Sequence, residues 1–168
     1  MKILISPHPD DETLFAAYTI LREKPMVVIV TYSTTQDGNG DDRLLESYRA
    51  MNILGAPVCF LGIKEDELTA ETLEKALGIF KGTDVVFIPE FEEEGNPQHN
   101  IVSTVGSKLF REARTYKTYS GLADRTIGKE IVPTDDELRL KQLAMACYES
   151  QMKNPDTLHY FNTTKEYV

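Results

Sequence analysis

The sequence predicts an α/β protein in which helices pack on both faces of a mostly parallel sheet. Three observations lead to this prediction. Short apolar runs rich in Val and Ile alternate with stretches whose apolar residues recur at helical spacing. Each apolar run is continuous, as in strands that are buried on both faces. Strands that alternate with helices in this way are typical of right-handed β-α-β crossovers in a parallel sheet.

Four strands and three helices are expected in the first half of the chain, in the order β-α-β-α-β-α-β. The strands are the apolar runs at residues 3–5, 26–30, 58–61 and 85–88. Each helix is indicated by apolar side chains three and four residues apart, which lie on one face. These faces are Leu14, Ala17, Tyr18 and Leu21; Leu44, Leu45, Tyr48, Met51 and Leu54; and Leu73, Ala76, Leu77 and Phe80.

Capping residues and glycines mark the ends of these helices. Asp41 or Asp42 is a suitable N-cap for the second helix, and Gly55 is a suitable stop. Thr69 can cap the third helix, which we expect to end at Gly82.

The second half of the chain is less regular. Residues 89–100 are expected to form a loop after the fourth strand, and a helix follows. Residues 116–133 show no clear period and are expected to be loop with one or two short strands. Thr134 and Glu137 form a capping box for a last helix, and residues 158–168 are expected to form an edge strand or an arm. The inner faces of the two helices are Val102, Val105, Leu109 and Ala113, and Leu140, Leu143, Ala144 and Cys147.

Length and composition limit the class of protein. The 168 residues fit a single domain, which we place at residues 1–168 because no linker or repeat divides the chain. The net charge of −9 argues against stable nucleic-acid binding, which depends on Lys and Arg. Two cysteines are too few for a disulfide framework, so a cytoplasmic location is expected. No apolar run is long enough for a secretion signal or a membrane span.

A polar run from Ser6 to Glu12 follows the first strand and opens the first helix. It places His8 beside three carboxylates, which repel one another unless a cation or a shared proton offsets the repulsion. Ligands of parallel sheets bind beyond the carboxyl ends of the strands. The loop at residues 89–100 ends at the same edge and carries His99, so we expect these groups to meet there.

Two histidines and one carboxylate are the ligands of many hydrolytic zinc sites, in which a fourth position stays open for water or substrate. His8 and Asp11 are three residues apart across a helix start, so their side chains can converge, and His99 completes the set. Asp10 would then stand free beside the metal, where a carboxylate can take a proton from water and return it to a leaving group.

The chain resembles the PIG-L/LmbE-like zinc N-deacetylases, which remove acetyl groups from N-acetylglucosamine-type amides. The most specific motif is Pro7-His8-Pro9-Asp10-Asp11-Glu12. Two weaker motifs are Arg43-x-x-Glu46 with Leu54-Gly55, and Tyr148-x-Ser150-Gln151. Together the motifs span nearly the whole chain, which is short for this family. The resemblance implies a Rossmann-like three-layer sandwich.

The resemblance also implies roles for individual residues. His8, Asp11 and His99 would bind Zn²⁺, Asp10 would be the general base, and Arg43 would contact the substrate.

One motif departs from the family. The family usually has His-Pro-Asp-His where this chain has Asn96-Pro97-Gln98-His99. The first histidine of that motif is thought to stabilise the oxyanion. Asn96 can still donate a neutral hydrogen bond there, and the loss of the charge is worth about 10²–10³ in rate. Gln98 cannot act as a carboxylate brace, and His159 is another group that could reach the site.

Each assignment has a simpler structural alternative. A histidine in a loop is more often a surface residue than a ligand, and Asp10 could merely cap the first helix. Arg43 and Glu46 are one helical turn apart and could form only a solvated ion pair. A set of basic residues between positions 108 and 129 could be an exposed helix face or an anion site. This set is Lys108, Arg111, Arg114, Lys117, Arg125 and Lys129.

We therefore expect a zinc-dependent enzyme that hydrolyses the N-acetyl group of a small amino-sugar-like substrate to a free amine and acetate. The replacements at Asn96 and Gln98 favour the alternative of a weakly active or inactive family member that binds a sugar or a nucleotide. A metal-free nucleotide-binding domain is a third hypothesis, but it does not explain the carboxylates beside His8. The sequence is compatible with a homo-oligomer.

Overall fold

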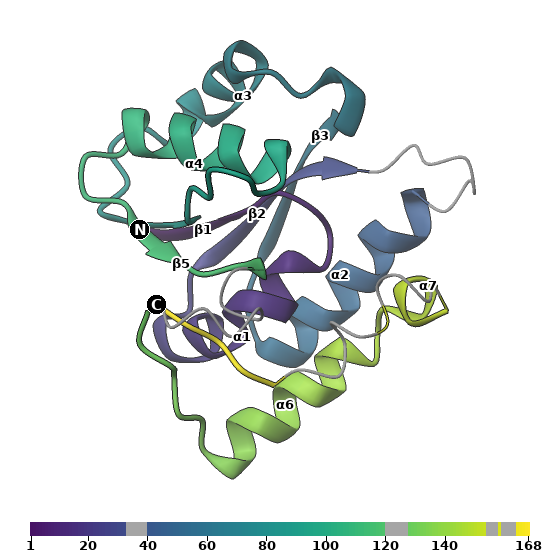
Figure 1. Ribbon diagram of the computed structural model, residues 1–168. Coiled ribbons are helices and arrows are strands. Elements are labelled where there is room, and N and C mark those ends of the chain that lie inside the picture. The colour runs from purple at the N-terminus through teal and green to yellow at the C-terminus, as the bar shows by residue number, and fades with distance from the viewer. Residues whose placement is uncertain (33–39, 120–127, 154–157, 159–163) are drawn as a thin grey trace.

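A computed structural model describes residues 1–32, 40–119, 128–153, 158 and 164–168 (Figure 1). In these residues five strands form one sheet, all parallel, in the spatial order β3-β2-β1-β4-β5. The predicted α/β class is thereby confirmed. The strands are β1 (Lys2–Ser6), β2 (Met26–Tyr32), β3 (Val58–Lys64), β4 (Val85–Pro89) and β5 (Arg114–Tyr116).

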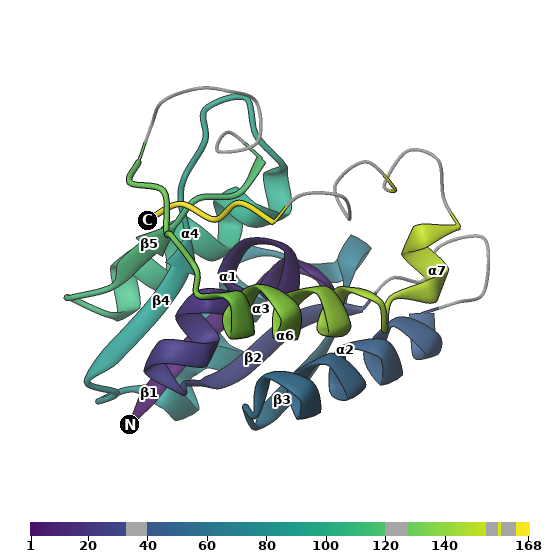
Figure 2. The same ribbon diagram turned by 90° about the horizontal axis from the view of Figure 1, so that it is seen from below.

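Helices cover both faces of the sheet. Figure 1 shows α3 and α4 on one face, and α1, α2 and α6 on the other; Figure 2 shows the latter face from below. The long helices are α1 (Asp11–Glu23), α2 (Gly40–Leu54), α3 (Ala70–Leu77), α4 (Pro97–Leu109) and α6 (Asp135–Met145). Shorter helical turns are η1 (Glu65–Glu67), η2 (Gly78–Phe80) and α7 (Glu149–Met152).

The strands are continuously apolar because the sheet has a core on each side. Leu4 of β1 packs with α1 and α2, whereas Ile3 and Ile5 point to the opposite face and pack with α3 and α4. Successive side chains of a strand point to opposite faces, so each strand needs apolar residues at every position.

The helix ends follow the local signals in most cases. The Thr69 side chain accepts a hydrogen bond from the backbone N–H of Thr72, and Thr134 forms the predicted capping box with Glu137. Gly55 after α2 and Gly82 after η2 have φ of 69° and 87°, which a side chain would disfavour. α3 itself ends at Leu77, earlier than the predicted end at Gly82. Among the described residues, no helix is long and apolar enough to cross a membrane.

The predicted inner face of α2 is partly wrong. Leu45 and Tyr48 are exposed, whereas Glu46 and Ser47 are buried. The prediction placed polar residues in solvent, but Glu46 is buried because it accepts hydrogen bonds from Ser150. The helix also begins at Gly40, so the predicted capping residues lie inside its first turn.

The predicted face of α6 is also partly wrong, although Leu140, Ala144 and Cys147 pack in the core as predicted. Leu143 is exposed, and Lys141 is completely buried. Lys141 is tolerated there because its ammonium group is paired with Glu166, far away in the sequence.

Residues 164–168 form an extended arm that lies beside α1 and residues 129–131. Its backbone bonds with Lys117, Lys129 and Ile131, and an isolated antiparallel bridge joins Glu130 to Tyr167. This agrees with the expected arm, whereas β5 begins at Arg114, before the stretch in which a strand was expected.

The loops that follow β1 and β4 lie at the point where the sheet topology reverses. β1 and β4 are neighbours, but the helices that follow them, α1 and α4, cover opposite faces (Figure 1). In open α/β sheets this switch point opens a crevice at the carboxyl strand ends, where ligands bind. The Ser6–Glu12 turn and the start of α4 both lie there.

Candidate metal centre

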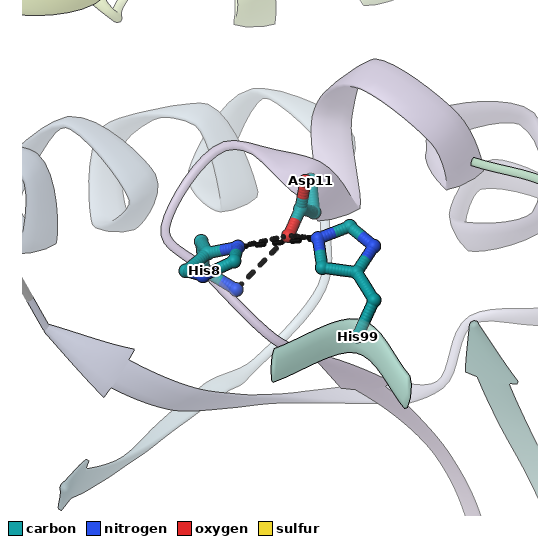
Figure 3. Close-up of side chains that lie close together, drawn as sticks. All are labelled: His8, Asp11 and His99. Carbon is teal, nitrogen blue, oxygen red and sulfur yellow. Dashed lines mark hydrogen bonds and ion pairs between the residues drawn. The ribbon is translucent and has the colours of Figure 1, made fainter. Parts of the chain in front are cut away.

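His8, Asp11 and His99 meet at the switch point, with three of their atoms in a small triangle (Figure 3). Asp11 Oδ2 lies 2.9 Å from His8 Nδ1 and 3.0 Å from His99 Nε2. The two ring nitrogens are 3.2 Å apart. All three residues are buried, so the surface-histidine alternative does not apply to His8 or His99.

The triangle fits a small divalent cation. Zn–N and Zn–O bonds of about 2.0–2.1 Å at tetrahedral angles separate the ligand atoms by about 3.3–3.4 Å, close to the distances found here. Within the described part of the chain, Asp11 Oδ1 is buried without a hydrogen-bond partner. The negative charge of this buried carboxylate is therefore incompletely compensated, and a cation held at its Oδ2 would stabilise it. The donor set of two imidazoles and one carboxylate suits zinc.

The electrostatics show how strongly these groups interact. Burial alone would lower the pKa of His8, but the Asp11 carboxylate outweighs it and raises the pKa to about 9. Burial opposes ionisation of Asp11, yet the two imidazoles hold the pKa of its carboxyl well below the usual range. Asp11 is therefore anionic, and a proton on His8 competes with a cation for the same place.

The carboxylate of Asp10 is not part of the His8–Asp11–His99 triangle and binds Arg43 instead. Its side chain makes no capping hydrogen bond to α1, so the capping alternative does not hold. Arg43 Nη2 donates to Asp10 Oδ2 at 2.8 Å and to the carbonyl of Pro9 at 3.0 Å. Burial raises the pKa of Asp10 to about 6, against the lowering effect of Arg43. A carboxylate with that pKa can exchange protons near neutrality.

Glu12 does more than begin α1, because its carboxylate also holds the turn before the helix. It is completely buried, and its Oε2 accepts hydrogen bonds from the backbone N–H of Asp10 at 2.9 Å and from Ser6 Oγ at 3.3 Å. The hydroxyl of Tyr148 donates to its Oε1. Burial raises the pKa of Glu12 to about 7. Glu12 thus fixes the turn that carries His8, Asp10 and Asp11.

The three sequence motifs are joined by these contacts. Arg43 binds Asp10 of the first motif, and Tyr148 of the third motif binds Glu12. Glu46 of the second motif accepts hydrogen bonds from the Ser150 backbone N–H and hydroxyl at 2.8 and 2.6 Å. The alternative of a solvated Arg43–Glu46 ion pair is therefore wrong.

The segment Asn96–His99 lies in the first turn of α4 rather than in a loop. Asn96 is the N-cap, and its Oδ1 accepts from the backbone N–H of Gln98 at 2.8 Å and of His99 at 3.4 Å. An Asn followed by Pro at the first helical position is a common helix start, and this signal could have placed α4 correctly. Gln98 Oε1 lies 2.6 Å from His8 Nε2, a contact that no short-range pattern indicates.

Other candidates contribute less. His159 and Arg125 lie outside the described residues. Of the remaining basic residues between positions 108 and 129, Lys108 pairs with Glu74 and Lys117 with Glu90. Arg114 and Lys129 line one cavity, which also contains the acidic residues Glu23 and Glu130.

The fold and the site together define an α/β protein with a buried His-Asp-His cluster and adjacent carboxylates at the switch point of its sheet. Residues 3–110 match the PIG-L family, described as GlcNAc-PI de-N-acetylase. The chain belongs to this family, as the motifs indicated. A comparison with curated proteins gives no match.

Solved structures with the same fold include enzymes of two kinds. The deacetylase triple mutant Orf2*T from the teicoplanin biosynthetic pathway is 16% identical, with a TM-score of 0.70 over 95% of this chain and 87% of that one. The zinc-inhibited form of the teicoplanin deacetylase Orf2 is 16% identical, with a TM-score of 0.66 over 90% of this chain and 85% of that one.

The 4-carboxy-2-hydroxymuconate hydratase GalB from Pseudomonas putida KT2440 is also similar. It is 16% identical, with a TM-score of 0.68 over 96% of this chain and 83% of that one. At these identities the likeness establishes the fold alone, and a shared fold can carry different chemistry. The family and the deacetylase relatives favour N-deacetylase-type activity, whereas the substrate depends on this chain's own residues.

Proposed function

We propose that the protein is a zinc-dependent N-deacetylase that hydrolyses the N-acetyl group of an amino-sugar-like small molecule to a free amine and acetate. The observation that carries this proposal is the buried triangle of His8 Nδ1, Asp11 Oδ2 and His99 Nε2 beside a separate carboxylate, Asp10. A bound Zn²⁺ supplies a Lewis acid that polarises the amide carbonyl and makes a water molecule more acidic.

In this proposal Asp10 moves the proton. Its carboxylate removes a proton from the attacking water and delivers it to the amide nitrogen as the C–N bond breaks, so that the amine leaves and acetate remains. The pKa of about 6 and the fixed contact to Arg43 support this role. Asn96 would donate from its amide nitrogen to the oxyanion, since its oxygen is occupied at the helix start.

Arg43 is the proposed substrate contact. Within the described residues its buried Nε has no hydrogen-bond partner, although its Nη2 is bound to Asp10 and Pro9. A guanidinium presents several donors in one plane, so one edge can hold Asp10 while another binds a substrate oxygen.

The two unpaired cysteines, Cys59 and Cys147, support the further proposal of a cytoplasmic location.

The test is release of acetate from a panel of N-acetylated amino sugars, with and without chelator and with zinc added in stoichiometric steps. Asp10→Asn should lower kcat by about 10²–10⁴, the usual contribution of a general base, while zinc affinity stays within a few-fold of the unaltered protein. Asp136→Asn, at an exposed position of α6, is the matched control and should leave kcat unchanged. Full activity of zinc-loaded Asp10→Asn would overturn the assignment.

A second candidate is a family member that binds an N-acetylated sugar but turns it over slowly. It is favoured by Asn96, whose amide oxygen caps α4 and whose neutral side chain stands where the family has a histidine. Saturable binding of such a sugar to the zinc-loaded protein, without release of acetate, would select this candidate.

A further inference from the structure

Gln98 makes two hydrogen bonds that together orient a proposed metal ligand. Its side chain projects from the first turn of α4, where Oε1 lies 2.6 Å from His8 Nε2. Its amide nitrogen donates to the backbone carbonyl of Glu65, in η1, at 3.1 Å. The side chain thus spans the gap between the β3–η1 connection and the His8 ring.

The chemistry of the two partners fixes which end of the amide faces His8. A backbone carbonyl can only accept a hydrogen bond, so the amide nitrogen of Gln98 must face Glu65. The amide oxygen then faces His8, and it too can only accept. His8 Nε2 must therefore carry a proton, which leaves the lone pair of a neutral imidazole on Nδ1, the atom that faces Asp11 and His99.

We propose that Gln98 is a positioning residue that holds His8 in the tautomer and orientation needed to bind zinc through Nδ1. This inference rests on the zinc site of the proposed function and extends it to a residue that does not touch the metal. Histidine ligands commonly donate their second N–H to a carboxylate, a carbonyl or water, and loss of that partner costs about 10–100-fold in metal affinity.

The choice of an amide has a specific consequence. A carboxylate at this position would attract the Nε2 proton and add negative charge, but it could not donate to the Glu65 carbonyl. Glutamine satisfies both neighbours without adding a negative charge beside the His8–Asp11–His99 triangle. The amide therefore replaces the brace that a carboxylate would provide.

The helical turn η1, which contains Glu65, also connects Gln98 to Asp10. The backbone carbonyl of Glu65 holds Gln98, and its carboxylate lies 3.9 Å from Arg43 Nη1. Arg43 in turn holds Asp10 through Nη2. One turn thus contacts both Gln98, which orients His8, and Arg43, which holds the proposed base.

The experiment compares Gln98→Met, which removes both hydrogen bonds at similar size, with Gln98→Glu, which retains only the acceptor. The matched control is Asn100→Leu, because Asn100 lies on the same helix and its amide also makes two hydrogen bonds, both to the backbone of Glu92. Zinc affinity is measured by competition with a chromophoric chelator. Slow exchange of the His8 Nε2–H with water is followed by ¹H–¹⁵N NMR in zinc-loaded protein.

We expect Gln98→Met to weaken zinc binding by about 10–100-fold and to speed Nε2–H exchange. Gln98→Glu should retain a slowly exchanging Nε2–H and bind zinc more tightly than Gln98→Met, and Asn100→Leu should bind zinc like the unaltered protein. Equal zinc affinity of Gln98→Met and the unaltered protein would overturn the inference.

Two further outcomes keep the test decisive. If the unaltered zinc-loaded protein carries its His8 proton on Nδ1, the inference fails whatever the variants do. If the unaltered protein does not bind zinc, the proposed function fails. If the unaltered protein binds zinc tightly and Gln98→Met binds it equally well, only the inference about Gln98 fails.

Discussion

Asp10 has a backbone conformation that residues other than glycine rarely adopt, with φ of 142°. Such a conformation costs about 1–3 kcal/mol and persists only where neighbours enforce it. Here the backbone N–H of Asp10 donates to the buried Glu12, and its carboxylate is held by Arg43. The turn is therefore kept in a shape that separates the Asp10 carboxylate from Asp11, consistent with different proposed roles for the two acids.

Zinc binding should release protons. With a pKa of about 9, His8 is protonated at neutral pH, and its Nδ1 must lose that proton before it can bind a metal. We expect release of at least about one proton per zinc at pH 7, and an affinity that falls as the pH drops, because protons then compete better. Isothermal titration calorimetry in buffers of different ionisation enthalpy measures this directly; a binding heat independent of the buffer would contradict it.

At the scale of elements, α1 is interrupted one turn after it begins. Ala16 has non-helical dihedral angles of −141° and 15°, which free backbone groups on either side of the break. The ammonium group of Lys141 donates to the carbonyl of Leu14 at 2.7 Å, and the carboxylate of Glu166 accepts from the N–H of Tyr18 at 3.0 Å. The backbone groups freed by the break are thus hydrogen-bonded to side chains of α6 and of the C-terminal arm.

Lys141 and Glu166 should be important for stability because both side chains are fully buried and lie 2.8 Å apart. Lys141→Met leaves the carboxylate unpaired, so we expect the free energy of unfolding to fall by about 3–5 kcal/mol. Lys141→Met/Glu166→Gln should recover part of that loss. The measurement is equilibrium denaturation by urea.

The control for this prediction is Lys2→Met. Lys2 pairs with Glu23 at 2.7 Å, but the two side chains are 45% and 35% exposed, and such pairs contribute about 0–1 kcal/mol. Equal effects of Lys141→Met and Lys2→Met would show that the buried pair does not stabilise the break.

Gly106 sets the distance between α4 and the sheet. A Cβ at this position would lie 2.7 Å from Cγ2 of Ile88 in β4, so Gly106→Ala should push α4 outward together with His99. We expect a loss of about 1–3 kcal/mol in stability and weaker zinc binding. Gly78→Ala is the control, since a Cβ there meets no atom within 4 Å. Unchanged stability and zinc affinity of Gly106→Ala would contradict this account of α4.

At the scale of the whole molecule, the features predicted from the sequence are those set by near neighbours. Continuous apolar runs indicated the strands, and Thr69, Thr134 and Gly55 marked helix ends through contacts within one turn. The proximity of His8, Asp11 and His99 was also predictable, because sequence positions that follow parallel strands lie at one edge of the sheet.

The features that were missed depend on partners far away in the chain. Glu46 is buried only because Ser150 satisfies it, and Lys141 only because Glu166 does. The role of Gln98 required knowledge of where His8 and the Glu65 carbonyl lie in space. No periodicity indicates such pairs, so the burial of Glu46 and Lys141 and the contact of Gln98 with His8 could not be derived from the sequence.

The central claim is that His8, Asp11 and His99 bind one zinc ion in the switch-point crevice. A crystal structure of the zinc-loaded protein, with anomalous data at the zinc edge, tests it most directly. We predict a single strong peak about 2.0–2.1 Å from His8 Nδ1, Asp11 Oδ2 and His99 Nε2. A peak at another place, or none at this triangle under saturating zinc, would contradict the account.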